Sequence, residues 1–307
     1  MSAAARSAFS RYDAGLLAVS LIWGGNYTVS KIALGYVSPV LYAAIRFTLS
    51  TFLLWLVTWR LGIARPLPRR VALRLMGWGF VGYTLNQLFF LWGLKLTSAT
   101  HSALIFGNLP VAVAVIGMFS GLERPRPRVW AGIVLGTIGV LLVVGGKGID
   151  FSGAMLRGEL FNVVALLLWA VFTVGIRQVA LGLNSAQVSA WAHLGGTPGF
   201  LLMAAPELLH PPEGLGHTAV WTGVLYSSVL SSVVASILWT RGLKALGGSR
   251  TALYNCVTPL VAGAVAWVVL AERPVAIQMA GAALVVVGIL VSREPMPAAA
   301  PKAQVEI

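Results

Sequence analysis

Apolar residues form long stretches along almost the whole chain, separated by short segments rich in charged residues, Pro and Gly. A bilayer core of ~30 Å requires about 20 consecutive, mostly apolar residues of α-helix. Scanning with this length predicts ten helical segments, at 14–34, 39–59, 73–94, 99–120, 129–146, 158–178, 186–205, 219–240, 250–271 and 275–292. No small-residue cleavage site follows the first segment, so we expect it to be retained. The pattern predicts an all-α integral membrane protein with ten transmembrane helices.

The composition agrees with a membrane protein and excludes several other classes. Of the 307 residues, 58% are hydrophobic and 10% are charged, and the mean hydropathy is +0.84. A soluble domain carries roughly 25% charged residues, so this chain has too few charges to cover a water-facing surface. Soluble enzymes, coiled coils and disordered chains are thereby excluded. The single cysteine, Cys256, offers neither a disulfide framework nor a thiolate metal site.

The distribution of positive charge predicts the orientation in the membrane. The chain has 22 Lys and Arg against 9 Asp and Glu, a formal net charge of +13. If the segments cross the membrane in turn, sixteen of these basic residues lie at or beyond segment ends on the same side of the membrane as the N-terminus, and five lie on the opposite side. Because cytoplasmic loops are enriched in Lys and Arg, we expect both termini in the cytoplasm. No basic groove with alternating aromatic residues is visible, so no nucleic-acid partner is expected.

The chain repeats itself at an offset of 149 residues. This offset aligns Gly93-Leu94-Lys95 with Gly242-Leu243-Lys244, Pro110 with Pro259, Glu123-Arg124-Pro125 with Glu272-Arg273-Pro274, Ala131-Gly132 with Ala280-Gly281, and Gly139 with Gly288. At nearby offsets Lys31 meets Arg177 and Arg46 meets His193. Residues 1–148 and 149–295 then form two repeats of five helices each, followed by a cytoplasmic tail at 296–307. An odd number of helices per repeat inverts one repeat relative to the other, which is typical of secondary transporters with a midplane substrate site.

Several of these sequences resemble a known family. The run Trp23-Gly24-Gly25-Asn26-Tyr27, the pair Arg46-Phe47, and the two copies of a segment that ends in Glu-Arg before a Gly-rich segment are similar to the ten-helix EamA branch of the drug/metabolite transporter superfamily. The resemblance covers nearly the whole chain. It implies a multi-pass carrier of the bacterial inner membrane, often an exporter of amino acids or related metabolites and sometimes an importer. The second copy differs from the first at Asn26 and Arg46, so a symmetric site would contain unlike residues.

Arg46 is the residue hardest to place in lipid. It follows Pro39 by seven residues, about 10 Å along the second segment at 1.5 Å per residue. A mid-membrane Arg must face a cavity or a partner, which makes it a candidate for the substrate site. One interpretation is that its guanidinium binds a substrate carboxylate or phosphate with two parallel hydrogen bonds. The other is a structural Arg that binds helix carbonyls or reaches toward the interface.

Aromatic and amide side chains recur at helical spacing in three segments. Trp23, Asn26, Tyr27 and Ser30 share one helix face, and two later segments repeat the pattern, with Tyr83 and Asn86 in one and Trp169 in the other. An aromatic wall with a few orienting amides is the usual composition of a small-molecule site. Interface anchoring and hydrogen bonding between helices are the alternatives.

Two prolines occupy matching places in the repeats. Pro110 and Pro259 each lie in the middle of a predicted segment, where each would free the carbonyl four residues earlier, that of Phe106 or of Asn255. Paired breaks in corresponding helices indicate a transporter site or hinge, and Asn108 and Asn255 lie beside them; packing kinks are the alternative. The run 195–199, Gly-Gly-Thr-Pro-Gly, is a further candidate hinge.

The titratable residues limit the coupling chemistry. All nine Asp and Glu fall in tails, loops or segment ends, so no carboxylate is expected at mid-depth for a proton relay. If protons are coupled, His193 is the best-placed titrating group, and a hydrogen-bonded structural His is the alternative. The chain shows no nucleophile and base pair, no Walker-type loop and no convergent metal ligands, so we expect neither an enzyme nor an ATP-driven pump, and no cofactor or metal.

Together these patterns predict a secondary carrier that moves a small zwitterionic or anionic metabolite, an amino acid or a related molecule, by alternating access. The family resemblance favours export. Import or exchange of organic anions or nucleotide-like metabolites, and efflux of apolar drugs, are the alternatives. The partners expected are the small-molecule substrate, the lipid bilayer and, in the coupled case, protons. The sequence does not indicate an oligomeric state.

Overall fold

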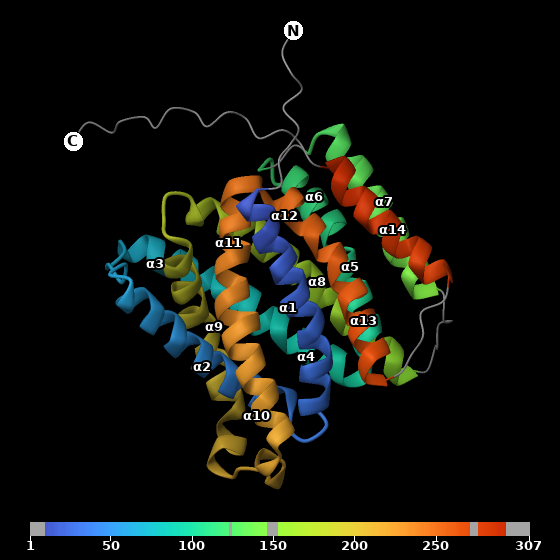
Figure 1. Ribbon diagram of the computed structural model, residues 1–307. Coiled ribbons are helices and arrows are strands. Elements are labelled where there is room, and N and C mark those ends of the chain that lie inside the picture. The colour runs from blue at the N-terminus through green and yellow to red at the C-terminus, as the bar shows by residue number, and fades with distance from the viewer. Residues whose placement is uncertain (1–9, 123–124, 146–152, 271–275, 293–307) are drawn as a thin grey trace, which may run out of the picture.

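Helices account for nearly all of the computed structural model, which describes residues 10–122, 125–145, 153–270 and 276–292 and has no strand among them (Figure 1). The first half contains α1 (Arg11–Ala33), α2 (Pro39–Arg60), α3 (Arg69–Gly79), the π-helix η1 (Phe80–Leu85), α4 (Asn86–Leu96), α5 (Ala99–Gly107), α6 (Leu109–Phe119) and α7 (Pro127–Gly145). Each predicted segment of this half overlaps one helix or a consecutive group.

The second half follows the same order. It contains α8 (Gly153–Ala180), α9 (Ser185–Leu209), the short 3₁₀-helix η2 (Glu213–Gly216), α10 (Thr218–Leu225), the π-helix η3 (Tyr226–Val234), α11 (Ala235–Leu246), α12 (Gly248–Leu253), the 3₁₀-helix η4 (Tyr254–Val257), α13 (Thr258–Leu270) and α14 (Ala276–Ser292). Three described helices are long and apolar enough to cross a membrane, Pro39–Arg60, Met155–Ala180 and Thr218–Leu246. The predicted tail at 296–307 and the repeated Glu-Arg pairs lie outside the described residues.

Local sequence signals set where the first helices begin and end. Ser10 and Asp13 form a capping box at the start of α1, in which each side chain binds the other residue's backbone N–H. Ser38 caps α2, and Pro39 supplies a first residue that needs no hydrogen-bond acceptor. Gly62, with φ of 65°, ends α2 in a left-handed conformation that a side chain would strain.

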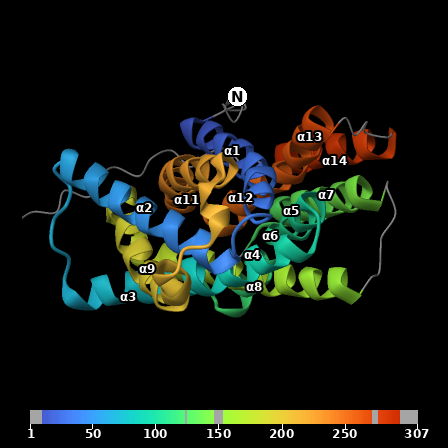
Figure 2. The same ribbon diagram turned by 90° about the horizontal axis from the view of Figure 1, so that it is seen from below.

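The helices form an elongated bundle in which the two repeats are intermixed. Figures 1 and 2 place α2, α3 and α9 at one end and α7 and α14 at the other, with α1, α4 and α11 between them. The helix pairs α2/α9 and α4/α8 each join one helix from each half. The central region is therefore lined from both repeats.

Reciprocal glycine contacts join α7 to α14. A Cβ at Gly139 would lie 2.6 Å from the carbonyl oxygen of Gly281, and a Cβ at Gly288 would lie 2.7 Å from that of Gly132. The 149-residue offset aligns Gly139 with Gly288 and Gly132 with Gly281. Each contact is therefore the repeat equivalent of the other. Such reciprocity is expected when equivalent surfaces meet about a two-fold axis, and small residues permit the close approach of helices.

A second reciprocal pair caps two helices. The Lys31 ammonium donates to the carbonyl of Leu94 at 2.7 Å, at the end of α4. The Arg177 Nε donates to the carbonyl of Leu243 at 3.1 Å, at the end of α11. Leu94 and Leu243 are again aligned by the repeat, as are Lys31 and Arg177. A cation at a helix C-terminus satisfies carbonyls that lack an intrahelical partner.

The breaks predicted at the two prolines are present in both halves. Pro110 lies in the first turn of α6, and Pro259 is the second residue of α13, so each proline begins a helix instead of interrupting one. The first helical turn tolerates proline because its N–H groups have no intrahelical acceptor. The chain breaks just before each proline, at Asn108 and at η4.

The run 195–199, in contrast to the proline sites, forms no break, because α9 continues through it. Its glycines are contact points: a Cβ at Gly195 would lie 2.2 Å from the carbonyl oxygen of Met76, and one at Gly196 would lie 2.6 Å from the Cβ of Tyr83. The glycines let α9 cross α3 and η1 at short range, which accounts for them without a hinge.

One carboxylate is buried where the repeats meet. Asp13, 1% exposed, lies 3.5 Å from the Arg250 guanidinium and accepts a short hydrogen bond from the Tyr254 hydroxyl. Asp13 lies at a helix end, as the sequence predicts. The sequence does not indicate that Asp13 binds residues more than 230 positions away. This contact ties the start of α1 to α12 and η4 in the other half.

Candidate functional site

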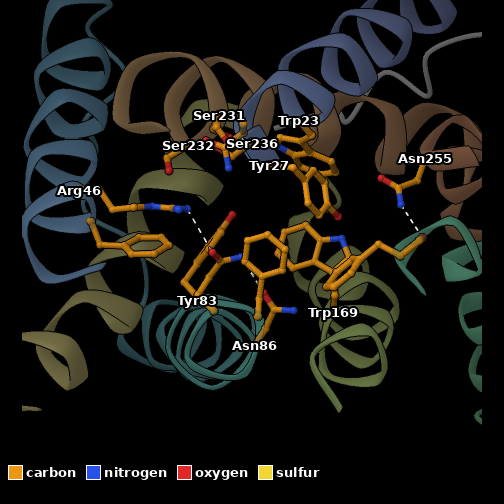
Figure 3. Close-up of a pocket in the computed structure, with 15 residues that line it drawn as sticks. Trp23, Tyr27, Arg46, Tyr83, Asn86, Trp169, Ser231, Ser232, Ser236 and Asn255 are labelled. Carbon is orange, nitrogen blue, oxygen red and sulfur yellow. Dashed lines mark hydrogen bonds between the residues drawn. The ribbon is translucent and has the colours of Figure 1, made fainter. Parts of the chain in front are cut away.

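A cavity of about 70 Å³ lies at the centre of the bundle, between the two repeats (Figure 3). It is lined by Trp23, Asn26, Tyr27, Arg46, Phe47, Tyr83, Asn86, Gln87, Phe90, Phe106, Trp169, Ser231, Ser232, Ser236 and Asn255. These residues come from α1, α2, η1, α4, α5, α8, η3, α11 and η4, so most of the bundle contributes to the wall. The lining residues include one cation and no carboxylate.

The sequence predicts nine substrate-binding residues. Eight of these nine residues line this cavity. They are Arg46, Trp23, Asn26, Tyr27, Tyr83, Asn86, Trp169 and Asn255. The ninth, Asn108, does not line it and instead occupies the residue before α6. Whether the eight bind a substrate stays a prediction. Helical spacing identified six of them, whereas Arg46 was identified by its charge and Asn255 by the nearby Pro259.

The Arg46 side chain extends from α2 toward the cavity (Figure 3) and is 3% exposed. Its Nη2 donates to the Gln87 Oε1 at 3.2 Å, while Nε and Nη1 have no hydrogen-bond partner in the described part of the chain. The guanidinium carbon lies 4.7 Å from the centre of the Phe47 ring. A buried cation with unpaired donors is energetically unfavourable unless an anion or water joins it.

Two amides hold the Arg46 head group in place. Gln87 Nε2 donates to Asn86 Oδ1 at 2.8 Å, and Asn86 Nδ2 donates to the carbonyl of Ala165 in α8 at 2.7 Å. This chain of hydrogen bonds connects α2 of the first repeat to α8 of the second through α4. A guanidinium fixed in this way presents its remaining N–H groups in one orientation.

Aromatic rings form the opposite wall. The Trp23 and Trp169 rings meet edge to face with centroids 5.7 Å apart, and Tyr83 meets Trp169 in the same geometry at 6.0 Å. Tyr27 packs against Phe90 at 5.3 Å. These separations lie within the range of favourable aromatic pairs. The wall offers an apolar surface to whatever part of a ligand points away from Arg46.

The two π-helices line the cavity at equivalent places in the repeats. Tyr83 belongs to η1, and Ser231 and Ser232 belong to η3. The wider π turn leaves backbone groups available, and the Ser231 carbonyl accepts a hydrogen bond from the Trp23 indole N–H at 3.2 Å. π-helical turns occur frequently at functional sites. Nothing in the amino-acid pattern predicts them.

The serines of η3 divide into two groups. Ser231 and Ser232, with Ser236 of α11, line the cavity. Ser227 instead binds Asn26 Oδ1 at 2.6 Å, and Ser228 donates to the Arg46 carbonyl at 3.0 Å. The second group ties η3 of one repeat to α1 and α2 of the other. The sequence shows a hydroxyl-rich helix but not this division.

Asn255 forms a hydrogen bond to the residue at the equivalent position of the other repeat, Phe106. Its side-chain Nδ2 donates to the carbonyl of Phe106 at 2.6 Å, and the offset of 149 aligns these two positions. The Phe106 carbonyl is the group that Pro110 leaves without an intrahelical donor. The two chain breaks therefore meet beside the cavity, and an amide from one break satisfies the backbone of the other.

His193 lies behind the wall of the cavity. Its ring is fully buried, with the Tyr83 ring centroid at 3.9 Å and that of Phe47 at 5.7 Å. The Nδ1 atom lies 2.9 Å from the carbonyl oxygen of Ser189, so it carries the proton, and Nε2 has no partner among the described residues. Tyr83 and Phe47 line the cavity directly, and His193 supports both.

The sequence matches a known family model in both halves. The EamA-like transporter family model matches residues 11–145 and 156–293, two copies that coincide with the repeats. An uncharacterized transporter of Archaeoglobus fulgidus is 31% identical over 278 residues, which cover 89% of this chain and 94% of that protein. A Salmonella typhimurium protein named a probable amino-acid metabolite efflux pump is 28% identical, over 92% of this chain and 95% of its own.

A solved crystal structure has the same fold. It superposes with a TM-score of 0.73 and covers 92% of this chain and 97% of its own, at 21% sequence identity. The fold, the duplicated halves and the relatives agree with one another and with the family resemblance seen in the sequence. The chain belongs to the EamA-like transporter family.

Proposed function

We propose that this protein spans the bacterial inner membrane ten times, with both termini in the cytoplasm, and exports a small zwitterionic or anionic metabolite by alternating access. The carrying observation is the buried Arg46 guanidinium, which has two donor atoms without a partner among the described residues, in a cavity whose lining residues include no carboxylate. A substrate carboxylate supplies both the missing charge and the missing acceptors. The name of the Salmonella typhimurium relative, an amino-acid metabolite efflux pump, agrees with this substrate class.

In the arrangement seen here, the cavity has no room for a drug-sized ligand. Its volume of about 70 Å³ is well below the roughly 300–1,000 Å³ of pockets that hold drug-sized ligands. A carboxylate with a short apolar portion can place its charge at Arg46 and its apolar atoms against Trp23 and Trp169. Transport then requires the two repeats to rock about this site, so that it opens to one side at a time.

The test is ligand-dependent thermal stability of the purified protein. A ligand that binds the folded state raises the melting temperature. We expect compounds that carry a carboxylate to stabilise the wild type and to leave Arg46→Ala unchanged, when amino acids, organic anions, nucleotides and cationic drugs are compared. Stabilisation of both proteins by cationic apolar compounds would instead indicate drug efflux and remove Arg46 from the site.

We further expect His193 to carry the pH dependence of transport. Nδ1–H is held by the Ser189 carbonyl, so Nε2 is the ring atom that accepts a proton. Protonation places a second cation near Arg46, and a carboxylate bound at Arg46 offsets that repulsion. In His193→Gln, an amide that does not titrate replaces the ring, and transport rates in proteoliposomes should vary less with pH. A variant with the wild-type pH profile would show that coupling, if present, uses another group.

A further inference from the structure

A second hollow lies away from the central cavity, between the first turns of α1 and the middle of α11. It has a volume of about 360 Å³ and is lined by Arg11, Tyr12, Gly15, Leu238 and Arg241. Both views show the start of α1 beside α11 (Figures 1 and 2), and these helices are in contact. The transport cycle proposed above assigns no role to this hollow.

The polar lining of the hollow is cationic. Arg11 and Arg241 are both exposed and come from different helices and different repeats. The Arg11 Nη2 donates to the Tyr12 hydroxyl at 3.1 Å, and its guanidinium carbon lies 5.0 Å from the Tyr12 ring centroid, which holds this side chain at the edge of the hollow. No Asp or Glu of the described residues lines the hollow, and the α1 carboxylate, Asp13, is buried against Arg250.

Apolar side chains continue from the hollow along the same two helices. Leu238 forms part of its floor. Farther along, Leu21 of α1 is 58% exposed, and Val234 and Leu230 of η3 are each 37% exposed. In the predicted orientation the hollow lies at the cytoplasmic surface and the apolar side chains lie within the bilayer. A pair of guanidinium groups above an exposed apolar surface matches the shape of a phospholipid.

We propose that this hollow, defined by Arg11, Tyr12 and Arg241, binds the phosphate head group of an anionic phospholipid of the cytoplasmic leaflet. Guanidinium groups bind phosphate oxygens with charge-assisted, bidentate hydrogen bonds. The cytoplasmic leaflet is rich in anionic lipid, and basic pockets between helices on that side bind such head groups. Because the ligand would contact α1 and α11, which belong to different repeats, its occupancy would stabilise the arrangement of the two halves seen here.

The experiment titrates lipid into the detergent-solubilised protein and follows the melting temperature. Phosphatidylglycerol should stabilise the wild type, and phosphatidylcholine should stabilise it less. In the double variant R11Q/R241Q the phosphatidylglycerol concentration at half-maximal stabilisation should rise roughly tenfold or more, because each basic residue near the surface contributes ~1 kcal/mol. The matched control is R70Q/R74Q, which removes two exposed arginines from α3, on the same predicted side.

The outcomes distinguish the sources of phosphate. Inorganic phosphate and glycerol 3-phosphate are tested beside the lipids, and we expect neither to reproduce the stabilisation. If inorganic phosphate stabilises the wild type as well as phosphatidylglycerol does, the hollow binds a free anion and the lipid proposal is wrong. Equal responses of R11Q/R241Q and R70Q/R74Q would also overturn it. The single variant R241Q gives the same comparison if the double variant is poorly folded, and Arg46→Ala should retain the full lipid response.

Discussion

Replacing Arg46 by methionine should abolish transport of carboxylate substrates while leaving the melting temperature of the ligand-free protein equal to or above that of the wild type. The charge is buried and, within the described part of the chain, makes one side-chain hydrogen bond, to Gln87. Replacing a poorly compensated buried charge by an apolar side chain of similar length is often neutral or stabilising. Two charge-assisted hydrogen bonds to a substrate contribute about 1.5–3 kcal/mol each, so carboxylate affinity should fall at least about a hundredfold.

Two further variants separate charge from geometry. Arg46→Lys keeps the cation but loses the planar pair of donors, so we expect it to bind carboxylates more weakly than the wild type and more strongly than Arg46→Met. Gln87→Leu removes the contact that orients Arg46 and should weaken binding less than loss of the cation does. Affinity from ligand-dependent melting and flux from proteoliposomes are measured in parallel. If Arg46→Met unfolds, or transports at the wild-type rate, Arg46 is a structural residue.

The sequence predicts most of the central cavity because its residues follow helical spacing. Trp23, Asn26 and Tyr27 share one face of α1, and Tyr83 and Asn86 share the corresponding face of η1 and α4. A polar face on a helix within a membrane must meet protein or water, so these residues face inward. The internal repeat then specifies which helices correspond, and the reciprocal glycine contacts of α7 and α14 agree with it.

The parts that the sequence does not predict depend on backbone geometry and on long-range contacts. The prolines predict a break in each of the two apolar segments, and both breaks are present, but the sequence does not show that each segment forms separate helices, with Pro110 and Pro259 in the first turn of the later one. The π turns η1 and η3 have no residue signature. The partner of Arg46, Gln87, lies 41 positions away, and helical periodicity does not relate residues on separate helices.

Substitution of Gly195 should separate helices α3 and α9 and cause one of the largest losses of stability of any single change in the bundle. A Cβ at this position would lie 2.2 Å from the Met76 carbonyl oxygen and 2.3 Å from its Cα, so backbone must move against backbone. The facing Gly79 is equally confined, with the Ala192 carbonyl oxygen 1.8 Å from its Cβ position. Gly195→Val should lower stability by about 3 kcal/mol or more, the upper end for overpacked sites, with loss of monodisperse protein in size-exclusion chromatography.

The matched control for Gly195→Val is Gly77→Val, at the residue that follows Met76 on α3. Gly77 is exposed and no described atom lies within 4 Å of its Cβ position, so the change should affect the melting temperature only slightly.

The smaller substitution Gly195→Ala tests the hinge interpretation of 195–199. If Gly195 is needed only for bending, Gly195→Ala should have the wild-type melting temperature and a lower transport rate. If Gly195 is needed for contact with Met76, Gly195→Ala should already have a lower melting temperature. Because α3 leads directly into η1, displacement of α3 should also displace Tyr83 and the cavity wall.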